Sequence, residues 1–299
     1  MRGRHARGAA IGLLADGVVR HPSWVPHPLS LFGTAMGRLE RRLHADDVGA
    51  GARYTAAGVA LGAAAAVPLR STILATWLAT GGHQLHEVAI DVADRLEDDD
   101  LDGARDLLPS LVGRDPAALD TSGVARAVVE SVAENTVDAV VAPAMWAAAA
   151  GPTGVLVHRA VDTMDSMVGY RTERYERFGR VAARLDDAMA WVPARATALL
   201  VAAARPDAAR AVLRAVRRDA PAHPSPNAGV AEAAFAAALG LQLGGPTPYP
   251  GGRVEDRPLL GSGRAPAAAD IRAAVELSAD VTTALATALA GYGLARLGR

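Results

Sequence analysis

The chain contains no lysine and no cysteine, and both absences limit the chemistry that it can perform. Without lysine, neither a Schiff base nor a phosphate-binding loop of the GxxxxGK[ST] type can form. Without cysteine, there is no disulfide, thiolate nucleophile or cysteine-ligated zinc. Aromatic residues make up only 4% of the 299 residues, whereas 51% are hydrophobic and many of these are alanine. The formal net charge of -1 leaves no basic surplus, so we expect no nucleic-acid partner.

Alternation of apolar and polar residues with a period of two is missing, so we expect no substantial sheet. Apolar residues instead recur every three or four positions, as in 84–97 and 119–142, which predicts helices. The second of these helices has a capping residue at Thr121 or Ser122. The segments 221–229 and 244–267 are rich in proline and glycine and predict loops. No repeat or long linker divides the chain, so we expect one all-α domain spanning residues 1–299.

Several stretches approach the length of a membrane span, which needs about 20 mainly apolar residues. They are 55–80, 139–157, 188–204, 229–245 and 279–295. The stretch 139–157 has no charge but is interrupted by Pro143, Gly151, Pro152 and Gly154. Broken helices with small residues are typical of membrane bundles with a polar interior. The alternative is a soluble, alanine-rich bundle. The apolar N-terminal stretch contains Asp16 and predicts a retained first helix rather than a cleaved signal peptide.

The first polar motif is ESVAENTVDAVVAP, residues 130–143. Glu130, Glu134 and Asp138 are spaced four residues apart, so on a regular helix they lie within an arc of about 80°. Such carboxylates repel one another unless solvated, protonated or neutralised by Mg²⁺ or arginines. A solvated helix face is the ordinary alternative. The apolar segment that follows at once favours a functional role, because charges near a membrane core are costly.

A second motif follows in residues 158–195. Asp162, Asp165, Ser166 and Gly169 share one face of a helix, and arginines 171, 174, 177 and 180 follow them. RLDDAMAWVPAR then adds Arg184, Asp186, Asp187 and Arg195. Carboxylates beside guanidinium groups can hold a metal ion and a polyphosphate together. The alternative is a surface helix end with ordinary ion pairs.

The third motif is DAPAHPSPNAGVAEAA, residues 219–234. Closely spaced prolines stiffen a loop that ends where a helix begins, and free amides at a helix N-terminus bind anions. His223 lies in this loop and could ligate, donate a hydrogen bond or simply pack.

Together these motifs resemble the adenosylcobinamide-phosphate synthases of cobalamin (vitamin B12) biosynthesis. The similarity is carried by VESVAENTVDAVVAP, VDTMDSMVGYRTERYERFGRVAARLDD, WVPAR and DAPAHPSPNAGVAEAAFAAALGLQLGG. GLLADGVVRHPSWVPHPLSLFG and RPLLGSGRAPAAADI extend it toward both ends. The resemblance implies a multi-pass helical protein of the cell membrane, in contact with lipid and with other late enzymes of the pathway. It implies an ATP-dependent ligase that joins adenosylcobyric acid to (R)-1-aminopropan-2-ol or its O-phosphate through an amide, with the corrinoid as substrate.

This hypothesis assigns roles to the polar residues of the motifs. The expected catalytic residues are Glu130, Glu134, Asp165 and His223. The expected substrate- and phosphate-binding residues are Asn135, Ser166, Tyr170, Arg171, Arg174, Arg184, Arg195, Ser225 and Asn227. The expected ligands of Mg²⁺ are Glu134, Asp138, Asp162, Asp165 and Asp187. Arginines would take the place of the missing lysine in binding phosphates, and His223 or a carboxylate would accept the proton of the amine.

Three departures from the family pattern occur. The family usually has Asn at the positions of Asp162 and Ala190, and Ser-Asp-Gly at residues 137–139. None of these removes Glu130, Glu134, Asn135, Asp165 or Asp187, so we expect activity. A second class of function stays open: a non-enzymatic membrane scaffold or corrinoid-binding regulator, in which the polar clusters serve recognition alone.

Overall fold

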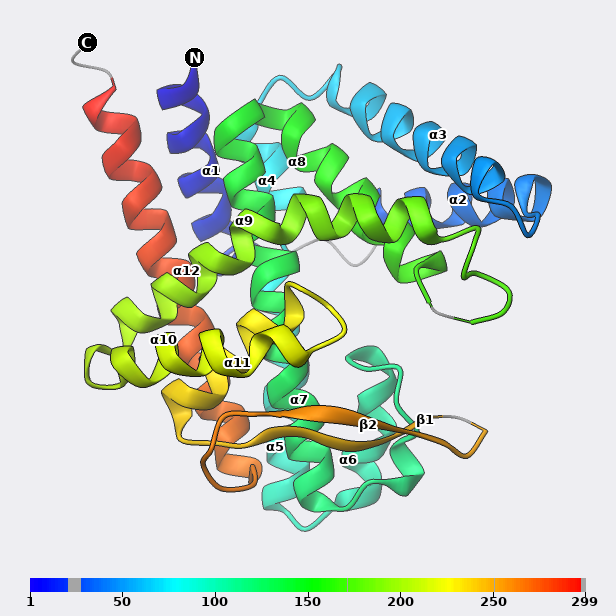
Figure 1. Cartoon of the computed structure of the whole chain (residues 1–299). Coiled ribbons are helices and arrows are strands. Elements are labelled where there is room, and N and C mark those ends of the chain that lie inside the picture. The colour runs from blue at the N-terminus through cyan, green and yellow to red at the C-terminus, as the bar shows by residue number, and fades with distance from the viewer. Residues whose placement is uncertain (21–27, 171, 250, 297–299) are drawn as a thin grey trace. The chain divides into compact units, whose positions relative to one another are not determined.

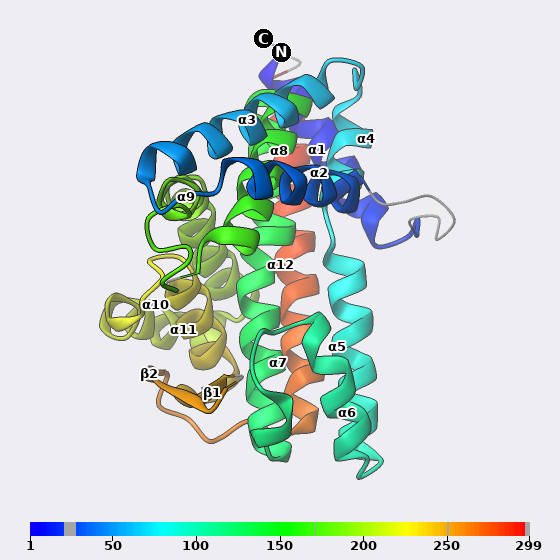
Figure 2. The same ribbon diagram turned by 90° about the vertical axis from the view of Figure 1, so that its right-hand side faces the viewer.

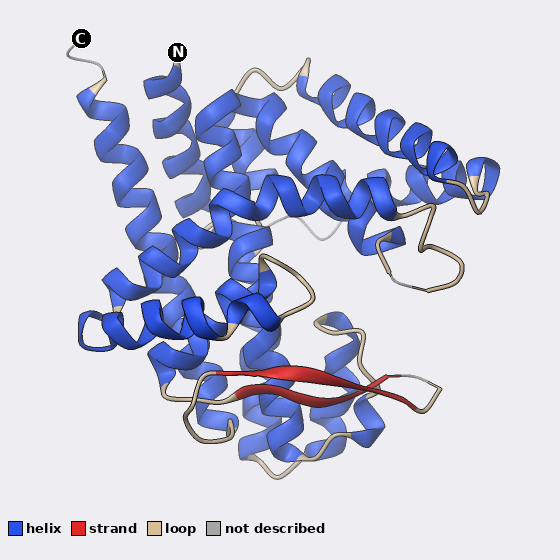
Figure 3. Ribbon diagram, viewed as in Figure 1, coloured by secondary structure: helices blue, strands red, loops and turns tan. Residues whose placement is uncertain are grey.

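Helices form most of the protein in the computed structural model, which describes residues 1–20, 28–170, 172–249 and 251–296. The strands in these residues are β1 (Leu243–Tyr249) and β2 (Arg253–Leu260), which pair antiparallel in one hairpin (Figure 3). The predicted helical character is confirmed. The loop predicted for 244–267 is wrong, since most of it is this hairpin. The prolines of this segment favour a loop in a reading of the sequence. The hairpin accommodates them because each of its two strands has a free edge, where proline is tolerated.

The described residues pack into two compact units. The first unit comprises Met1–Thr80, Asp138–Val192 and Leu285–Arg299, and the second comprises Gly81–Val137 and Pro193–Ala284. The chain passes from the second unit to the first between Val137 and Asp138, in the middle of the first polar motif. A single domain spanning 1–299 stays a prediction.

In the first unit, α1 (Arg2–Asp16), α4 (Thr72–Ala79) and α8 (Ala142–Val168) pack side by side (Figure 1). The unit also contains α2 (Pro28–Leu43), α3 (Val48–Ala66) and the first part of α9 (Arg180–Ala204). α1 can approach α4 closely because a side chain at Gly12 would overlap α4. α8 is kinked at Ala150 and Gly151, where the sequence predicts a break.

In the second unit, α7 (Thr121–Asn135) packs against α5 (Gly82–Glu97) and α6 (Leu101–Leu107) (Figure 2). It also packs against α11 (Ala228–Leu239), which in turn contacts α10 (Ala209–Arg218) and the hairpin. The remaining elements are the 3₁₀ turns η1 (Leu108–Ser110), η2 (Pro116–Ala118), η4 (Pro206–Ala208) and η5 (Ala220–Ala222), and most of α12 (Ala268–Ala295). The helix predicted at 84–97 is confirmed as α5.

The helix predicted at 119–142 begins and ends differently. Asp120, rather than Thr121 or Ser122, caps it, because its carboxylate accepts a hydrogen bond from the amide of Gly123 at 2.7 Å. After Asn135 the chain continues as a π-helix, η3 (Thr136–Val141), before α8 begins. π-helical turns contain more residues than α-helical turns and often mark functional sites.

Within the described residues, two continuous helical stretches are long and apolar enough to cross a membrane: Thr121–Val168 and Ala268–Ala295. They contain the predicted segments 139–157 and 279–295. Residues 55–80 are instead divided between α3 and α4, and 229–245 is interrupted at Gly240, which ends α11 in the left-handed conformation. The segment 188–204 lies in α9, which carries Pro193 inside it. Buried core helices of soluble proteins can meet the same criteria.

Candidate functional site

The three acidic residues of the first motif lie in two kinds of helix. Glu130 and Glu134 lie on α7, whereas Asp138 lies in the π-helical segment and belongs to the first unit. A π turn changes the rotation per residue, so the arc expected for a regular helix does not apply beyond Asn135. The grouping of Asp138 with the two glutamates stays a prediction.

Glu130 lies at the centre of a buried ionic cluster in the second unit. Its side chain is 2% exposed and pairs closely with the guanidinium of Arg114, which is 5% exposed. The Nη1 atom of Arg257 on β2 lies 3.7 Å from the same carboxylate oxygen. The amide of Gly244 on β1 donates to the other oxygen at 2.7 Å. Glu130 therefore does not lie on a solvated helix face. Its charge is neutralised by arginines, which is one of the two kinds of neutralisation that the sequence suggested for this motif.

His223 and Glu232 form a second buried pair within the same unit. Their Nε2 and Oε1 atoms are 3.7 Å apart, and each side chain is 1% exposed. Neither atom has a hydrogen-bond partner within the described part of the chain. Nδ1 of His223 lies 3.1 Å from both the amide nitrogen and the carbonyl oxygen of Ser225, so the tautomer of the ring decides which of them it bonds. When Nδ1 carries the proton and donates to the carbonyl, Nε2 keeps a lone pair that can accept a proton.

Burial controls the charge of this pair. Burial, and then the nearby charge of Glu130, raises the pKa of the Glu232 carboxyl well above its ordinary value. Burial also lowers the pKa of the His223 imidazole. Both groups are thereby kept neutral when the site is empty, so the pair combines an acid that holds its proton with a base that is free to accept one.

The loop before α11 is organised by Ser225 and Asn227. The Ser225 hydroxyl accepts hydrogen bonds from the amides of Asn227 and Ala228, at 3.3 and 3.1 Å. The prediction that the first amides of this helix are free is therefore wrong for Ala228. Arg195 donates to the side-chain oxygen of Asn227 at 2.8 Å, so α9 and the loop are joined by a polar contact in the second unit.

Apart from Arg195, the described residues of the second motif lie in the first unit, and several of them form ion pairs there. Asp162 accepts a hydrogen bond from Arg159 at 2.8 Å, and Arg174 donates to Glu40 at 3.0 Å. The predicted substrate-binding residues Ser166, Tyr170 and Arg184 are exposed, and the carboxylates Asp165 and Asp187 are half-buried. Arg171 lies outside the described residues. For Asp162 and Arg174 the geometry matches the alternative interpretation, ordinary ion pairs.

The predicted Mg²⁺ ligands are not assembled into a protein cage. Glu134 belongs to the second unit, whereas Asp138, Asp162, Asp165 and Asp187 belong to the first. Among the described residues, no three His, Asp or Glu side chains are arranged to hold a metal ion. The side chains present thus do not fit a metal site made of protein ligands alone.

The site therefore contains part of the predicted set together with residues that sequence reasoning missed. The predicted residues that belong to the second unit are Glu130, Glu134, Asn135, Arg195, His223, Ser225 and Asn227, and their roles stay predictions. The missed residues are Arg114, Glu232 and Arg257. Glu232 had a signal in the sequence, because it is the only charged residue of α11. If a helix that is otherwise apolar is buried on all sides, its one acid must be paired or protonated.

The protein is mostly helical and contains buried arginine–glutamate and histidine–glutamate pairs. Buried titratable groups of this kind are typical of helical enzymes with a polar site. Residues 9–278 match the family model described as CobD/Cbib protein. The cobalamin biosynthesis protein CobD of Mycobacterium tuberculosis is 49% identical, with 91% of each chain covered. CobD of Rhodobacter capsulatus is 40% identical over 86% of this chain and 88% of its own. That of Sinorhizobium fredii is 37% identical over 94% of each. No solved structure matches.

The chain belongs to the CobD/Cbib family of cobalamin biosynthesis proteins. The resemblance seen in the sequence motifs is thereby confirmed.

Proposed function

We propose that this protein is the synthase that joins the propionate carboxyl of adenosylcobyric acid to (R)-1-aminopropan-2-ol, or to its O-phosphate, through an amide bond. The observation that carries the proposal is the buried pair of His223 and Glu232 beside Glu130 and its arginines. These residues come from VESVAENTVDAVVAP and DAPAHPSPNAGVAEAA, two of the motifs that link the chain to the family, and from segments near them. The pair supplies a neutral base in a site from which water is excluded.

Formation of an amide at neutral pH requires that the carboxylate be activated. A carboxylate oxygen attacks the γ-phosphorus of ATP, ADP leaves, and the acid becomes an acyl phosphate. The amine nitrogen then attacks the carbonyl carbon, and inorganic phosphate leaves with the carbon–oxygen electron pair. The amine loses one proton, for which His223 is the proposed acceptor. Glu232 faces the ring at 3.7 Å. A positive charge on the ring would favour ionisation of this carboxyl, and the resulting carboxylate would stabilise the imidazolium.

ATP enters this proposal as a substrate, together with Mg²⁺. Because the described residues form no protein cage for a metal, phosphate oxygens and water would supply most of its ligands, as is common for Mg²⁺. The proposed contacts of the substrates are the guanidinium of Arg195 and the side chain of Asn227, which lie together at 2.8 Å. Arginine suits phosphates and carboxylates because its donors are planar and paired.

We further propose that the protein is a multi-pass protein of the cell membrane, with the first unit in contact with lipid. Most of the large apolar side chains that are exposed in the described residues belong to this unit. They include Ile11, Leu14, Leu31, Leu61, Ile73, Leu74, Trp191 and Val192, whereas the second unit contributes Leu199, Leu213, Val254 and Leu259. Exposed apolar side chains on this scale indicate an interaction surface. The acidic and basic residues of the candidate site would then lie in the second unit, which exposes fewer large apolar side chains.

The reaction is tested with the full-length protein in nanodiscs, supplied with adenosylcobyric acid, aminopropanol or its phosphate, ATP and Mg²⁺. Mass spectrometry should detect a corrinoid whose mass has increased by the amine minus one water. His223→Ala should lower turnover at least tenfold, or about 1.4 kcal/mol in the barrier. The matched control is His83→Ala on α5, since His83 pairs with Glu87 at a partly exposed position. Corrinoid binding without any product, with all components present, would instead support the non-enzymatic scaffold.

A further inference from the structure

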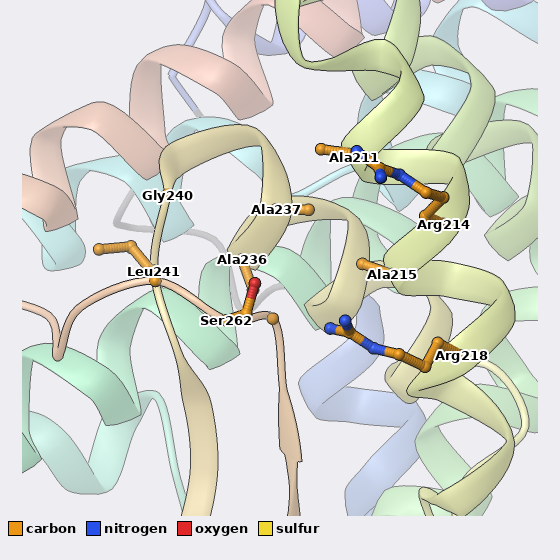
Figure 4. Close-up of a pocket in the computed structure, with 11 residues that line it drawn as sticks. Ala211, Arg214, Ala215, Arg218, Ala236, Ala237, Gly240, Leu241 and Ser262 are labelled. Atoms are coloured by element: carbon orange, nitrogen blue, oxygen red, sulfur yellow. The ribbon is translucent and has the colours of Figure 1, made fainter.

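A pocket of about 370 Å³ lies in the second unit, between α10, the C-terminal end of α11 and the turn Gly261–Gly263 (Figure 4). Arg214 and Arg218 line it from α10, and Ser262 lines it from the turn. Figure 4 shows both arginine side chains extending from α10 toward α11 and the Ser262 turn. The turn belongs to RPLLGSGRAPAAADI, a segment of which the proposed site uses only Arg257.

Several hydrogen-bond donors at this pocket belong to exposed residues, Arg214, Arg218 and Ser262, and have no protein partner among the described residues. Arg214 donates only through Nε, to the carbonyl of Arg210 at 3.3 Å, so its two terminal nitrogens have no partner among the described residues. The amide and the hydroxyl of Ser262 likewise have none there. Arg218 uses Nε and Nη2 on Asp219, at 2.6 and 2.9 Å, and Nη1 remains. An acceptor with several oxygens would satisfy these donors together.

The walls of the pocket are held in place by a buried carboxylate. Asp219 is 9% exposed, and it accepts the amide of Gly261 at 2.9 Å in addition to the two bonds from Arg218. One side chain thereby fixes both the guanidinium and the turn. Gly261 has a φ of +79°, and a side chain at Gly263 would overlap the carbonyl oxygen of Gly240. The turn can therefore approach the end of α11 only because both residues are glycine.

The charge and size of the pocket define the class of ligand. Asp219 offsets one of the two guanidinium charges, so the lining keeps a positive charge. Its volume is near the lower end of small-molecule pockets, which range from about 300 to 1,000 Å³. It is too small for a corrin ring. Arginine forks with a hydroxyl and a free amide are the groups that bind phosphate oxygens.

We propose that this pocket is a binding site for the phosphate group of a small phosphate ester, held by Arg214, Arg218 and Ser262. The phosphate could come from a soluble monoester or from a lipid headgroup, since both present the same oxygens. None of its lining residues is among those to which the proposed amide-forming reaction assigns a role, and its test by phosphate binding does not depend on that reaction.

Binding is measured by equilibrium dialysis of inorganic phosphate against the full-length protein in phosphatidylcholine nanodiscs. The wild-type protein should bind phosphate saturably at one site. Arg214→Gln should weaken binding about tenfold, because a charge-assisted hydrogen-bond pair is lost. Ser262→Ala should weaken it severalfold without any change in net charge. The matched control is Arg217→Gln on the same helix, which is exposed and does not line the pocket, and which should change binding less than twofold.

Two further arms identify the source of the phosphate. If phosphoethanolamine binds more tightly than phosphate, and phosphatidylglycerol in the nanodiscs has no effect, the ligand is a soluble ester. If phosphatidylglycerol in the nanodiscs displaces phosphate from the wild-type protein, but does not displace the phosphate that Arg214→Gln still binds, the ligand is a lipid headgroup. The proposal is overturned if the wild-type protein shows no saturable binding, if Arg214→Gln and Ser262→Ala bind normally, or if Arg217→Gln weakens binding as much as Arg214→Gln.

Discussion

At the scale of single residues, the energetics of the site depend on charges that are buried with their partners. Glu130 and Arg114 are each no more than 5% exposed. A buried pair adds little stability over an apolar pair, but removal of one partner leaves the other charge without compensation. The same carboxylate also holds the amide of Gly244. Glu130 therefore connects α7 to the hairpin and to the segment before α7.

Glu130→Gln tests this interpretation. The change keeps the shape of the side chain but leaves Arg114 charged and buried, so the free energy of unfolding should fall by about 3–5 kcal/mol. Thermal unfolding in detergent measures it. The matched control is Glu97→Gln, which breaks an exposed pair with Arg272 and should lower the melting temperature far less. Equal shifts in the two variants would contradict a buried, compensated Glu130.

Glu232 makes the stability of the protein depend on pH in a definite direction. The unfolded chain ionises this carboxyl near its ordinary pKa, about 4.3, whereas burial raises its pKa in the folded protein. Its contribution to stability is therefore fully present below about pH 4.3 and is lost as the pH rises toward the folded pKa. Glu232→Gln removes the titration, so the melting temperature of this variant relative to wild type should increase with pH. A difference that is constant from pH 4 to pH 8 would show that Glu232 titrates normally.

At the scale of elements, the helices follow from the sequence pattern, whereas the features that shape the site do not. The apolar spacing in 84–97 and the breaks in 139–157 predicted α5 and the kink in α8. No comparable signal marks the π-helical segment at 136–141, because its extra residue per turn depends on packing around it. Its prolines made the hairpin segment resemble a loop in the sequence, so the place of Arg257 on a strand was not predicted. Arg114 precedes α7 in an irregular segment that local pattern does not connect to Glu130.

The hairpin itself depends on glycine at Gly244, where φ is +82° and a side chain would overlap the carbonyl oxygen of Pro258. Gly252 provides a matched control, because its φ is +78° but nothing lies within 4 Å of an added Cβ. Both substitutions by alanine carry the cost of positive φ, about 1–2 kcal/mol. Gly244→Ala should cost about 1–3 kcal/mol more, through overpacking. Denaturation of the two variants measures the difference, and equal stabilities would contradict the close approach of β1 and β2.

At the scale of the whole molecule, the polar residues of the three motifs divide between two units. The sequence placed Glu130, His223, Asn227 and Arg195 in functional motifs, and all four belong to the second unit. It also placed Asp138 and Asp162 with them, but these belong to the first unit. Sequence spacing shows which residues share a helix face, but not which side chains from distant segments meet. That information is needed to find Arg114 and Arg257 beside Glu130.

The proposed membrane location is tested by extraction. If the first unit contacts lipid through its exposed apolar side chains, the full-length protein should stay in the membrane fraction after a carbonate wash and should enter solution only with detergent. A peripheral protein held by charge is the control, since carbonate releases it. Recovery of this protein in the carbonate supernatant would favour the soluble alanine-rich bundle.

The central claim is that the protein makes an amide from an activated carboxylate, and the transfer of an isotope tests it most directly. Adenosylcobyric acid labelled with ¹⁸O in its free propionate carboxylate is incubated with the amine, ATP, Mg²⁺ and the protein in nanodiscs. Activation by phosphoryl transfer moves one labelled oxygen to the departing phosphate. The account predicts one ¹⁸O in inorganic phosphate for each amide formed. Amide product with unlabelled phosphate would contradict the acyl phosphate, and the absence of amide product would contradict the synthase itself.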